Sequence, residues 1–328
     1  MRALVTGGAG LVGSSLCRSL LAQGAKVFCV DNFTLGTKRH IEDLKSHSDF
    51  LFEDWDVSVH GWHRPLISKS GSNQAFDVVF HLAANSDISL GHQQPQMDAQ
   101  RTFQTTFETL LAAKELGIPH FIFSSTSAVY GKEPLYPTPE DSSRMHPVSV
   151  YGAGKLASEC FISAFVENYN LSAWVYRFGN VVGQRLTHGV IYDFVGRLKN
   201  NPKELTVLGN GLQNKTYIDV EDCVSGILTA YQKSPAGSSH SSKFQVFNLS
   251  TTGSTTVKDI AEETNRVVTG GVAKIQYGSS SIGWVGDVAK TSLDVERISK
   301  LGWTPRHTST EAVYNSIRKY YQWSTESK

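Results

Sequence analysis

Short runs of apolar, often β-branched or aromatic residues alternate with longer stretches of helical periodicity in the first half of the chain. The runs cover residues 3–5, 26–30, 77–81, 120–123 and 173–176. Between the first two runs, Val12, Leu16 and Leu20 recur every fourth residue, which predicts a helix with one buried stripe, and Gly24 ends it. This alternation predicts a parallel β-sheet with helices on both faces.

The pattern is looser after about residue 180. A Gly/Asn-rich stretch covers residues 208–211, and a Ser-rich stretch without periodicity covers residues 234–242, which we interpret as a surface loop. A helix should follow, because residues recur at helical spacing from Val257 to Val268, behind Ser254 and Thr255 as candidate caps. The C-terminal half is therefore expected to be folded and to have the smaller core.

Together these patterns predict an α/β protein with a Rossmann-like doubly wound parallel sheet and a smaller mixed α/β C-terminal lobe. We expect residues 1–180 to form the sheet domain and residues 181–328 to form the lobe. Segments near residues 216–231 and 244–250 are expected to return to the sheet domain.

Composition removes several classes of function. The 328 residues include 31 Lys and Arg against 30 Asp and Glu, so a net charge of +1 provides no overall field for a nucleic acid or a membrane surface. The four cysteines, at positions 17, 29, 160 and 223, fit no zinc or redox spacing. The sequence shows no signal-peptide pattern and no apolar run of about 18 residues. We expect a cytoplasmic protein with no metal, nucleic-acid partner or membrane contact.

The first strand runs directly into a glycine-rich turn. Gly7, Gly10 and Gly13 stand where the strand gives way to the helix, with Leu11 and Val12 between the last two. Side chains at the glycine positions would block the turn, the approach of a pyrophosphate to backbone N–H groups, or the packing of helix on strand. The helix N-terminus adds partial positive charge. This arrangement predicts a dinucleotide site, although a plain tight turn would also explain the glycines alone.

A carboxylate ends the second strand. Asp31, followed by Asn32, can accept hydrogen bonds from both ribose hydroxyls of an adenosine and would repel a 2′-phosphate, which favours NAD over NADP. Lys38 and Arg39 lie close enough in sequence to keep NADP open. A solvated loop acid or a helix cap is the alternative explanation of Asp31.

A tyrosine and a lysine are spaced for one helix face. Tyr151 and Lys155 stand at i and i+4, and a phenol becomes a base at neutral pH only if its pKa falls by about three units, which a neighbouring ammonium and an oxidised nicotinamide can favour. Taken alone, such a pair usually lies on a helix surface and has no catalytic role. Upstream, however, a buried strand ends in four hydroxyl residues, Ser124 to Ser127, at the sheet edge where ligands bind. A strand-to-loop cap is the other explanation of these hydroxyls.

These motifs, in this order, resemble the extended short-chain dehydrogenase/reductase family and, within it, the nucleotide-sugar 4-epimerases typified by UDP-glucose (UDP-galactose) 4-epimerase. The resemblance covers nearly the whole chain. It rests on the glycine turn, Asp31 and Asn32, the pair Asp56 and Val57, the segment His81 to Ala84, the hydroxyl run to Gly131, Tyr151 and Lys155, the segment Arg177 to Gly183, and the later Gly286, Asp287 and Leu301 to Pro305.

The resemblance implies roles for individual residues. Thr126, Tyr151 and Lys155 would be catalytic: Tyr151 takes the proton of the sugar 4-hydroxyl, Thr126 bonds the same oxygen, and Lys155 bonds the nicotinamide ribose and lowers the tyrosine pKa. NAD would be held by a set that includes both catalytic side chains of the later helix: Gly7, Gly10, Leu11, Val12, Gly13, Asp31, Asn32, Asp56, Val57, Leu82, Ala83, Ala84, Ser124, Tyr151, Lys155 and Phe178. The nucleotide sugar would be bound by Ser86, Thr126, Tyr151, Asn180, His188, Val190, Lys215 and Asp287.

Several positions depart from the family pattern. Lys215 replaces the usual Arg, Trp284 replaces the arginine two residues before Gly286, and Thr102 stands where an Asn often faces the cofactor. For His188, a surface-loop role is as compatible with the sequence as ligand contact. Thr291 aligns with an aromatic that excludes N-acetylated sugars in some relatives, so UDP-N-acetylglucosamine and UDP-N-acetylgalactosamine are also expected as substrates.

Other functions remain open. Dehydratases of the family carry Asp and Glu after the catalytic hydroxyl, where this chain has Ser127 and Ala128, so dehydration is disfavoured. A decarboxylase or reductase of the same family is a further alternative, and a non-catalytic dinucleotide-sensing scaffold is a third. As is usual in the family, helices around residues 95–116 and 151–169 are expected to pair with their copies in a homodimer.

Overall fold

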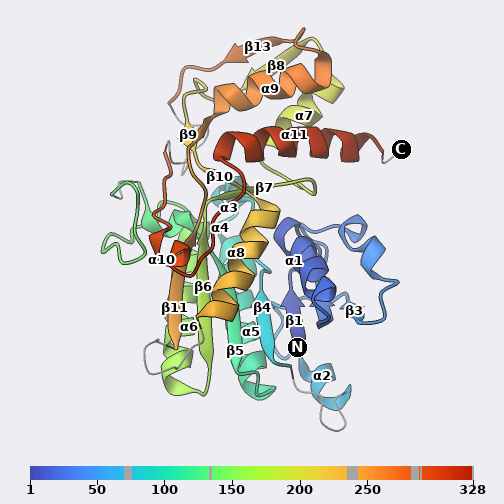
Figure 1. Cartoon of the computed structure of the whole chain (residues 1–328), viewed down its shortest axis with the longest axis vertical. Coiled ribbons are helices and arrows are strands. Elements are labelled where there is room, and N and C mark those ends of the chain that lie inside the picture. Colours follow the sequence, from blue (N-terminus) through green and yellow to red (C-terminus); the bar gives the residue numbers. More distant parts are fainter. Residues whose placement is uncertain (70–75, 133–134, 235–242, 282–287, 289, 327–328) are drawn as a thin grey trace.

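Seven parallel strands form the central sheet of the computed structural model, in the order β11–β6–β5–β4–β1–β2–β3 (Figure 1). The model describes residues 1–69, 76–132, 135–234, 243–281, 288 and 290–326. The strands of the sheet are β1 (Arg2–Thr6), β2 (Lys26–Val30), β3 (Phe50–Glu53), β4 (Val78–His81), β5 (His120–Thr126), β6 (Ser172–Phe178) and β11 (Phe244–Leu249). The expected Rossmann-like sheet is confirmed, and segment 244–250 contributes its edge strand.

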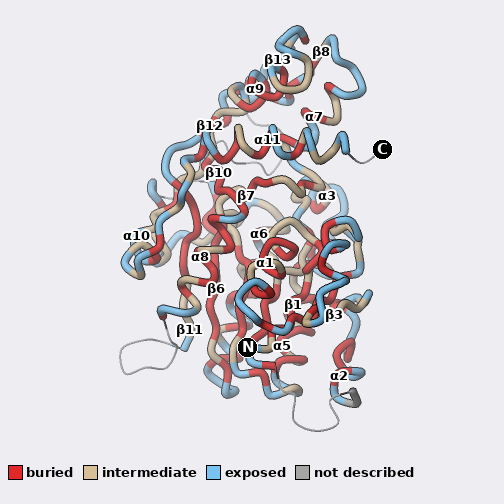
Figure 2. Tube along the Cα trace, turned by 45° about the vertical axis from the view of Figure 1, so that its right-hand side comes forward, coloured by how far each residue is buried: buried red, intermediate tan, exposed pale blue. Residues whose placement is uncertain are grey.

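Two helical layers explain why these strands read as continuous apolar runs. Helices α1 (Leu11–Ala22) and α8 (Val220–Lys233) share one buried core with one face of the sheet. Helices α5 (Thr105–Glu115) and α6 (Val150–Asn168) share a second core with the other face. The buried residues therefore follow the strands and the inner sides of the helices (Figure 2). A strand buried on both faces has no polar positions to alternate with apolar ones.

The strand order reverses beside β1. Thr6 at the end of β1 lies opposite Val30 of β2 on one side and His81 of β4 on the other. The connections from β1 to β2 and from β4 to β5 therefore leave the sheet in opposite directions. In such sheets a crevice forms outside the carboxyl ends of the strands at this point, and ligands bind there.

The helix expected around residues 95–116 consists of three segments. A short helix, α4 (Pro95–Asp98), leads into a π-helical turn, η3 (Ala99–Gln104), and then into α5. A π-turn inserts an extra residue into the helical repeat, which rotates the side chains that follow. The other short elements are η1 (Lys38–His40), η2 (Glu42–Leu44), α2 (Arg64–Lys69), α3 (Ile88–Gln93), η4 (Ser127–Tyr130) and α10 (Glu296–Ser299).

The smaller lobe lies at one end of the sheet, beyond the carboxyl ends of its strands (Figure 1). Its helices are α7 (Val190–Asn200), α9 (Val257–Thr269) and α11 (Ser309–Thr325), which share a third core. Its strand pairs are β8 (Glu204–Val207) with β13 (Lys274–Tyr277), β7 (Asn180–Val182) with β10 (Tyr217–Asp219), and β9 (Asn214–Lys215) with β12 (Thr255–Thr256).

Two local predictions in this half need correction. The N-cap of α9 is Thr256, which forms a capping box with Asp259, rather than Ser254 or Thr255. Ser234 is buried at the C-terminal end of α8 and hydrogen bonds Trp174 Nε1 at 3.1 Å, so it is not part of a surface loop. The rest of the Ser-rich stretch, residues 235–242, lies outside the described residues.

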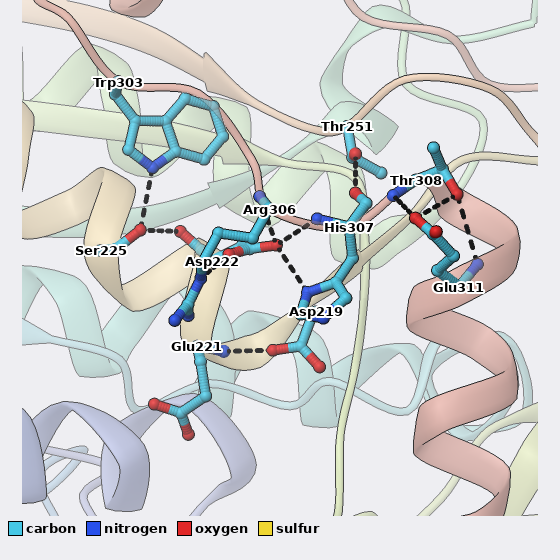
Figure 3. Close-up of polar contacts among 10 residues, drawn as sticks. All are labelled: Asp219, Glu221, Asp222, Ser225, Thr251, Trp303, Arg306, His307, Thr308 and Glu311. Atoms are coloured by element: carbon cyan, nitrogen blue, oxygen red, sulfur yellow. Dashed lines mark hydrogen bonds and ion pairs between the residues drawn. The ribbon is translucent and has the colours of Figure 1, made fainter.

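A buried carboxylate ties the lobe to the sheet domain. Asp222, near the start of α8, is completely buried and accepts hydrogen bonds from the backbone N–H groups of Arg306 and His307 at 3.0 and 3.1 Å (Figure 3). It also accepts one from Arg306 Nε at 2.8 Å. Trp303 Nε1 donates to Ser225 Oγ one turn further along α8 at 2.9 Å. The segment that leads into α11 is thereby fixed to a helix of the sheet domain.

Candidate active site

A cavity of about 820 Å³ lies where the carboxyl ends of the strands face the lobe. Its walls come from the ends of β2, β4, β5 and β6, from the turn after β1, and from α7, β9 and β10. This is the crevice that the strand order predicts. A volume of this size is in the range of protein sites that enclose small-molecule ligands.

The glycine turn forms one wall. A Cβ at Gly7 would lie 2.5 Å from the backbone nitrogen of Ala83, and one at Gly13 would lie 2.2 Å from the carbonyl oxygen of Gly7. Gly7 also has φ +74°, which side chains disfavour. The N-cap of α1 is Gly10, with no side-chain cap and no acidic residue in the first turn. The turn thus leaves backbone N–H groups and partial positive charge available to a pyrophosphate, and it fits NAD.

Asp31 is positioned for the adenosine ribose. Its carboxylate accepts hydrogen bonds from the N–H groups of Ala9 at 2.9 Å and Phe33 at 2.8 Å. Burial raises its pKa, and these two bonds act in the opposite direction. Each carboxylate oxygen still has a lone pair for a ribose hydroxyl.

The nearby cations are engaged elsewhere. The Arg39 guanidinium lies 3.6 Å from the ring centroid of Trp323 and donates to the Trp323 carbonyl at 2.9 Å. The Lys38 ammonium lies 5.5 Å from the Phe33 ring centroid. Neither side chain lines the cavity, so neither Lys38 nor Arg39 is placed to meet a 2′-phosphate beside Asp31.

Thr126, Tyr151 and Lys155 converge on the same cavity. Thr126 ends β5, and its side chain hydrogen bonds the Tyr151 phenol at the start of α6. Lys155, one turn later and buried, donates from Nζ to the carbonyl oxygen of Ser124 at 2.6 Å. Its Nζ lies 5.9 Å from the Tyr151 ring centroid. The strand end and the helix face that the sequence singled out are therefore neighbours in space.

Burial dominates the ionisation of this pair. It raises the pKa of Tyr151 above its ordinary value; Asp98 raises it further, and the hydrogen bond with Thr126 lowers it. Burial lowers the pKa of Lys155 to about 7, against the influence of the Glu159 and Asp98 carboxylates. The expected depression of the tyrosine pKa is thus not a property of these side chains alone. It requires further positive charge at the site.

A buried ion pair stands behind Lys155. Glu159, one turn further along α6, accepts hydrogen bonds from Arg177 Nε at 3.1 Å and Nη2 at 2.7 Å, and another from the Ser125 hydroxyl. Arg177 Nη1 also donates to Tyr130 Oη at 2.9 Å. Tyr151, Lys155 and Glu159 therefore form a line along α6 in which the ammonium stands between the phenol and a fixed carboxylate.

The lobe side of the cavity carries the predicted substrate residues. Asn180 begins β7, and its amide donates to the Thr216 carbonyl at 3.2 Å. Lys215 ends β9. His188 precedes α7, lies 3.0 Å from the Thr187 hydroxyl through Nδ1, and hydrogen bonds the backbone of Ser86. Burial lowers the pKa of His188, which favours a neutral ring.

Each of the predicted site residues that the structure describes lines this one cavity. On the cofactor side these are Gly7, Gly10, Leu11, Val12, Gly13, Asp31, Asn32, Asp56, Val57, Leu82, Ala83, Ala84, Ser124, Tyr151, Lys155 and Phe178; on the substrate side they are Ser86, Thr126, Asn180, His188, Val190 and Lys215. Asp287 lies outside the described residues, as does Trp284.

Two positions at which the chain departs from the family pattern do not line the cavity. Thr102 is completely buried and donates to Asp98 Oδ1 at 3.3 Å instead of lining the cavity. Thr291 accepts a hydrogen bond from Thr216 N–H at 3.4 Å and does not line the cavity either. Acceptance of N-acetylated sugars stays a prediction.

Sequence reasoning missed several lining residues. Trp55 lies beside the Asp56–Val57 pair, Arg101 and Thr105 come from the π-turn and the start of α5, and Asp193 and Arg197 come from α7. Trp55 could have been found from its place before Asp56. Nothing in the apolar pattern marks the π-turn that carries Arg101 or the position of Thr105 in the wall.

Other candidate chemistries are not supported among the described residues. The four cysteines, all of which are described, form no disulfide. Within the described ranges, no group of three or more His, Cys, Asp or Glu is arranged to hold a metal ion. No helix in the described part of the chain is long and apolar enough to cross a membrane.

Comparison with known proteins agrees with the dinucleotide site that the geometry indicates. Residues 3–249 match the model of the NAD dependent epimerase/dehydratase family. The chain is 28% identical to a UDP-glucose 4-epimerase of Mycolicibacterium smegmatis over 97% of both chains, and 25% identical to a mouse dTDP-D-glucose 4,6-dehydratase over 100% of this chain and 92% of that one. A crystal structure of Thermotoga maritima UDP-glucose 4-epimerase with UDP-glucose matches with a TM-score of 0.84 at 29% identity, covering 99% of this chain and 100% of that one.

Proposed function

Because the chain belongs to the NAD dependent epimerase/dehydratase family, we propose that it is an NAD-dependent 4-epimerase of a nucleotide sugar, acting on UDP-glucose and UDP-galactose. The observation that carries the proposal is the convergence of Thr126, Tyr151 and Lys155 on the cavity whose other wall is the glycine turn. A hydroxyl, a phenol and an ammonium at one point are the groups that oxidation of a sugar hydroxyl needs.

The described side chains would act in a fixed order. Tyr151 takes the proton of the 4-hydroxyl, while Thr126, already bonded to the phenol, holds the same oxygen. When bound, NAD would supply the acceptor for the hydride of C4, a positive charge beside the phenol, and the hydride that is returned. Return of the hydride to the other face of the 4-keto carbon, with return of the proton by Tyr151, would invert the stereochemistry with no net oxidation.

Charge at the site gives a reason to expect that the cofactor binds first. In the protein alone, burial keeps the Tyr151 phenol protonated. Lys155, supported by Glu159, can hold a positive charge near the phenol, and the oxidised nicotinamide would add another. Proton removal from the sugar is thereby linked to the oxidised form of the cofactor.

Dehydration is the second candidate, because dehydratases occur among the relatives. Elimination needs an acid and a base beside the sugar C5 and C6, and the two residues after Thr126 are Ser127 and Ala128 in the turn η4. Ala128 contributes its N–H to the Thr126 hydroxyl at 3.2 Å. These residues support epimerisation over dehydration.

The test is conversion of UDP-galactose to UDP-glucose without added NADH. Tyr151→Phe should lower kcat by about 10²- to 10⁴-fold and retain bound NAD, because it removes the general base and leaves the turn intact. Tyr192→Phe, on an exposed part of α7, is the matched control and should keep full activity. A 4-keto-6-deoxy sugar as product, or full activity of Tyr151→Phe, would contradict the proposal.

A further inference from the structure

The glycine turn contains no cationic side chain of its own. Its residues from Gly7 to Gly13 are glycine, alanine, leucine and valine, so the turn offers a pyrophosphate only backbone N–H groups and the end of α1. A dinucleotide pyrophosphate carries two negative charges, and the net charge of the protein is only +1. Any full positive charge must therefore come from another wall of the cavity.

Arg101 lies on the adjoining wall. It lines the cavity from the π-turn η3. Its carbonyl oxygen accepts a hydrogen bond from the Thr105 hydroxyl at 3.0 Å, and the same hydroxyl lies 3.4 Å from the carbonyl oxygen of Ala83. The backbone nitrogen of Ala83 is the atom that a Cβ at Gly7 would meet at 2.5 Å. The Arg101 backbone is thus separated from the glycine turn only by the Thr105 hydroxyl and by Ala83, which lies in the loop between β4 and α3.

The other lining cations have positions or partners that set them apart. Lys155 donates to the Ser124 carbonyl at 2.6 Å, and Arg197 donates from Nη1 to the Thr206 carbonyl at 2.7 Å. Lys215 belongs to the lobe strand β9. Within the described part of the chain, the Arg101 guanidinium forms no hydrogen bond or ion pair, although it is partly buried in the cavity wall.

The neighbouring Thr102 fixes the π-turn that carries Arg101. Thr102 is buried against α6, where a Cβ at Gly154 would lie 3.3 Å from its methyl group, and its hydroxyl is bonded to Asp98. With Thr102 turned inward, Arg101 and Thr105 line the cavity on either side of it.

We propose that Arg101 binds the pyrophosphate of the dinucleotide, opposite the N-terminus of α1. Guanidinium and phosphate form strong charge-assisted, often bidentate hydrogen bonds, and a partly buried site screens them little. The bound cofactor would then be held by backbone N–H groups on one side and by a fixed cation on the other.

Binding to nucleotide-free protein tests the proposal without any turnover. Arg101→Gln should weaken binding of NAD and of ADP-ribose about tenfold, the loss of one charge-assisted hydrogen bond, and should leave binding of adenosine unchanged because adenosine has no phosphate. The salt dependence of NAD binding should fall as well. Arg101→Lys should recover part of the affinity, since it keeps the charge but not the fork.

Arg197→Gln is the matched control, because it removes a cation from the lobe side of the same cavity and should leave NAD affinity unchanged. Unchanged NAD affinity in Arg101→Gln would overturn the proposal. An equal loss for adenosine, or a loss confined to UDP-glucose, would overturn it too. Because these are binding measurements, the result stands whether or not the epimerase reaction is found.

Discussion

Burial of a charged side chain in the active site lowers the stability of the folded protein, and this cost can be measured for Lys155. Burial lowers its pKa from 10.5 to about 7, so the folded protein releases a proton that the unfolded chain keeps. Between about pH 7 and pH 10.5 the unfolded state binds more protons, and the contribution of Lys155 to stability therefore rises with pH. The cost of the buried charge is greatest below pH 7.

The predicted consequence concerns Lys155→Met. The unfolding free energy of the native protein minus that of the variant, measured by urea unfolding, should increase by about 1 kcal/mol per pH unit between pH 7.5 and 9.5. Lys300→Met is the control. Its side chain is exposed and its pKa is raised by Glu296, so it should show no such gain in this range. A constant difference between the native protein and Lys155→Met would mean that the lysine keeps its proton when folded.

Two helical glycines should respond oppositely to the same substitution. A Cβ at Gly91 in α3 would lie 1.8 Å from Asp98 Oδ2, an oxygen that is buried without a hydrogen-bond partner among the described residues. A Cβ at Gly196 in α7 would meet nothing within 4 Å. Gly91→Ala should lower the free energy of unfolding by about 1–3 kcal/mol through overpacking, and Gly196→Ala should raise it by about 0.5–1 kcal/mol. Equal effects in thermal unfolding would contradict the packing argument.

Some of this residue-scale detail could be predicted from the sequence. The turn Gly7–Gly13, the carboxylate Asp31 and the spacing of Tyr151 and Lys155 each have a local physical reason, so sequence was enough to single them out. Arg101 and Thr291 do not. Arg101 lines the cavity from a π-turn, and Thr291 lies outside the lining and accepts a hydrogen bond from the Thr216 N–H. Both outcomes depend on tertiary contacts.

At the scale of elements, the strands of the sheet were easier to predict than the contacts that join the lobe to the sheet. Runs buried on both faces mark β1, β2, β4, β5 and β6 directly, whereas the joining of the lobe to the sheet depends on Asp222, an acidic residue in a helix with no special local pattern. Its four hydrogen bonds reach residues 84 and 85 positions away. Such long-range polar contacts have no signature in a single sequence.

The hydrogen bonds that Asp222 accepts from Arg306 and His307 lead to a prediction about how the lobe is joined to the sheet domain. Asp222→Ala would leave the N–H groups of Arg306 and His307 without the buried carboxylate that accepts from them, and it should lower the free energy of unfolding by about 3 kcal/mol. Arg306→Gln is the matched control. The Arg306 side chain is 63% exposed, so its loss should cost at most about 1 kcal/mol. Denaturant unfolding of both variants measures this, and equal losses would assign the stability to the exposed ion pair instead.

The whole molecule has an aromatic surface that the site does not use. Phe103 of η3, Phe107 of α5 and Phe161 of α6 contact one another, with ring centroids 5.1 Å apart for Phe103–Phe161 and 5.6 Å for Phe107–Phe161. Phe161 is 41% exposed. These are the helices that the family resemblance assigns to a homodimer, and the same helices hold Arg101, Tyr151 and Lys155 on their inner side. Pairing with a second copy would therefore also brace the active site.

Phe161→Glu tests that arrangement. A charge in the centre of a desolvated aromatic contact is strongly unfavourable, so the variant should run as a monomer in sedimentation velocity, whereas the native protein is expected to run as a dimer. Tyr192→Glu, at an equally exposed aromatic on α7 of the lobe, should leave the assembly unchanged. Sedimentation of the native protein as a monomer would contradict the expected homodimer. If Phe161→Glu instead remained dimeric, the two copies would have to meet through another surface, and the helices that hold Tyr151 and Arg101 would be braced only from within their own chain.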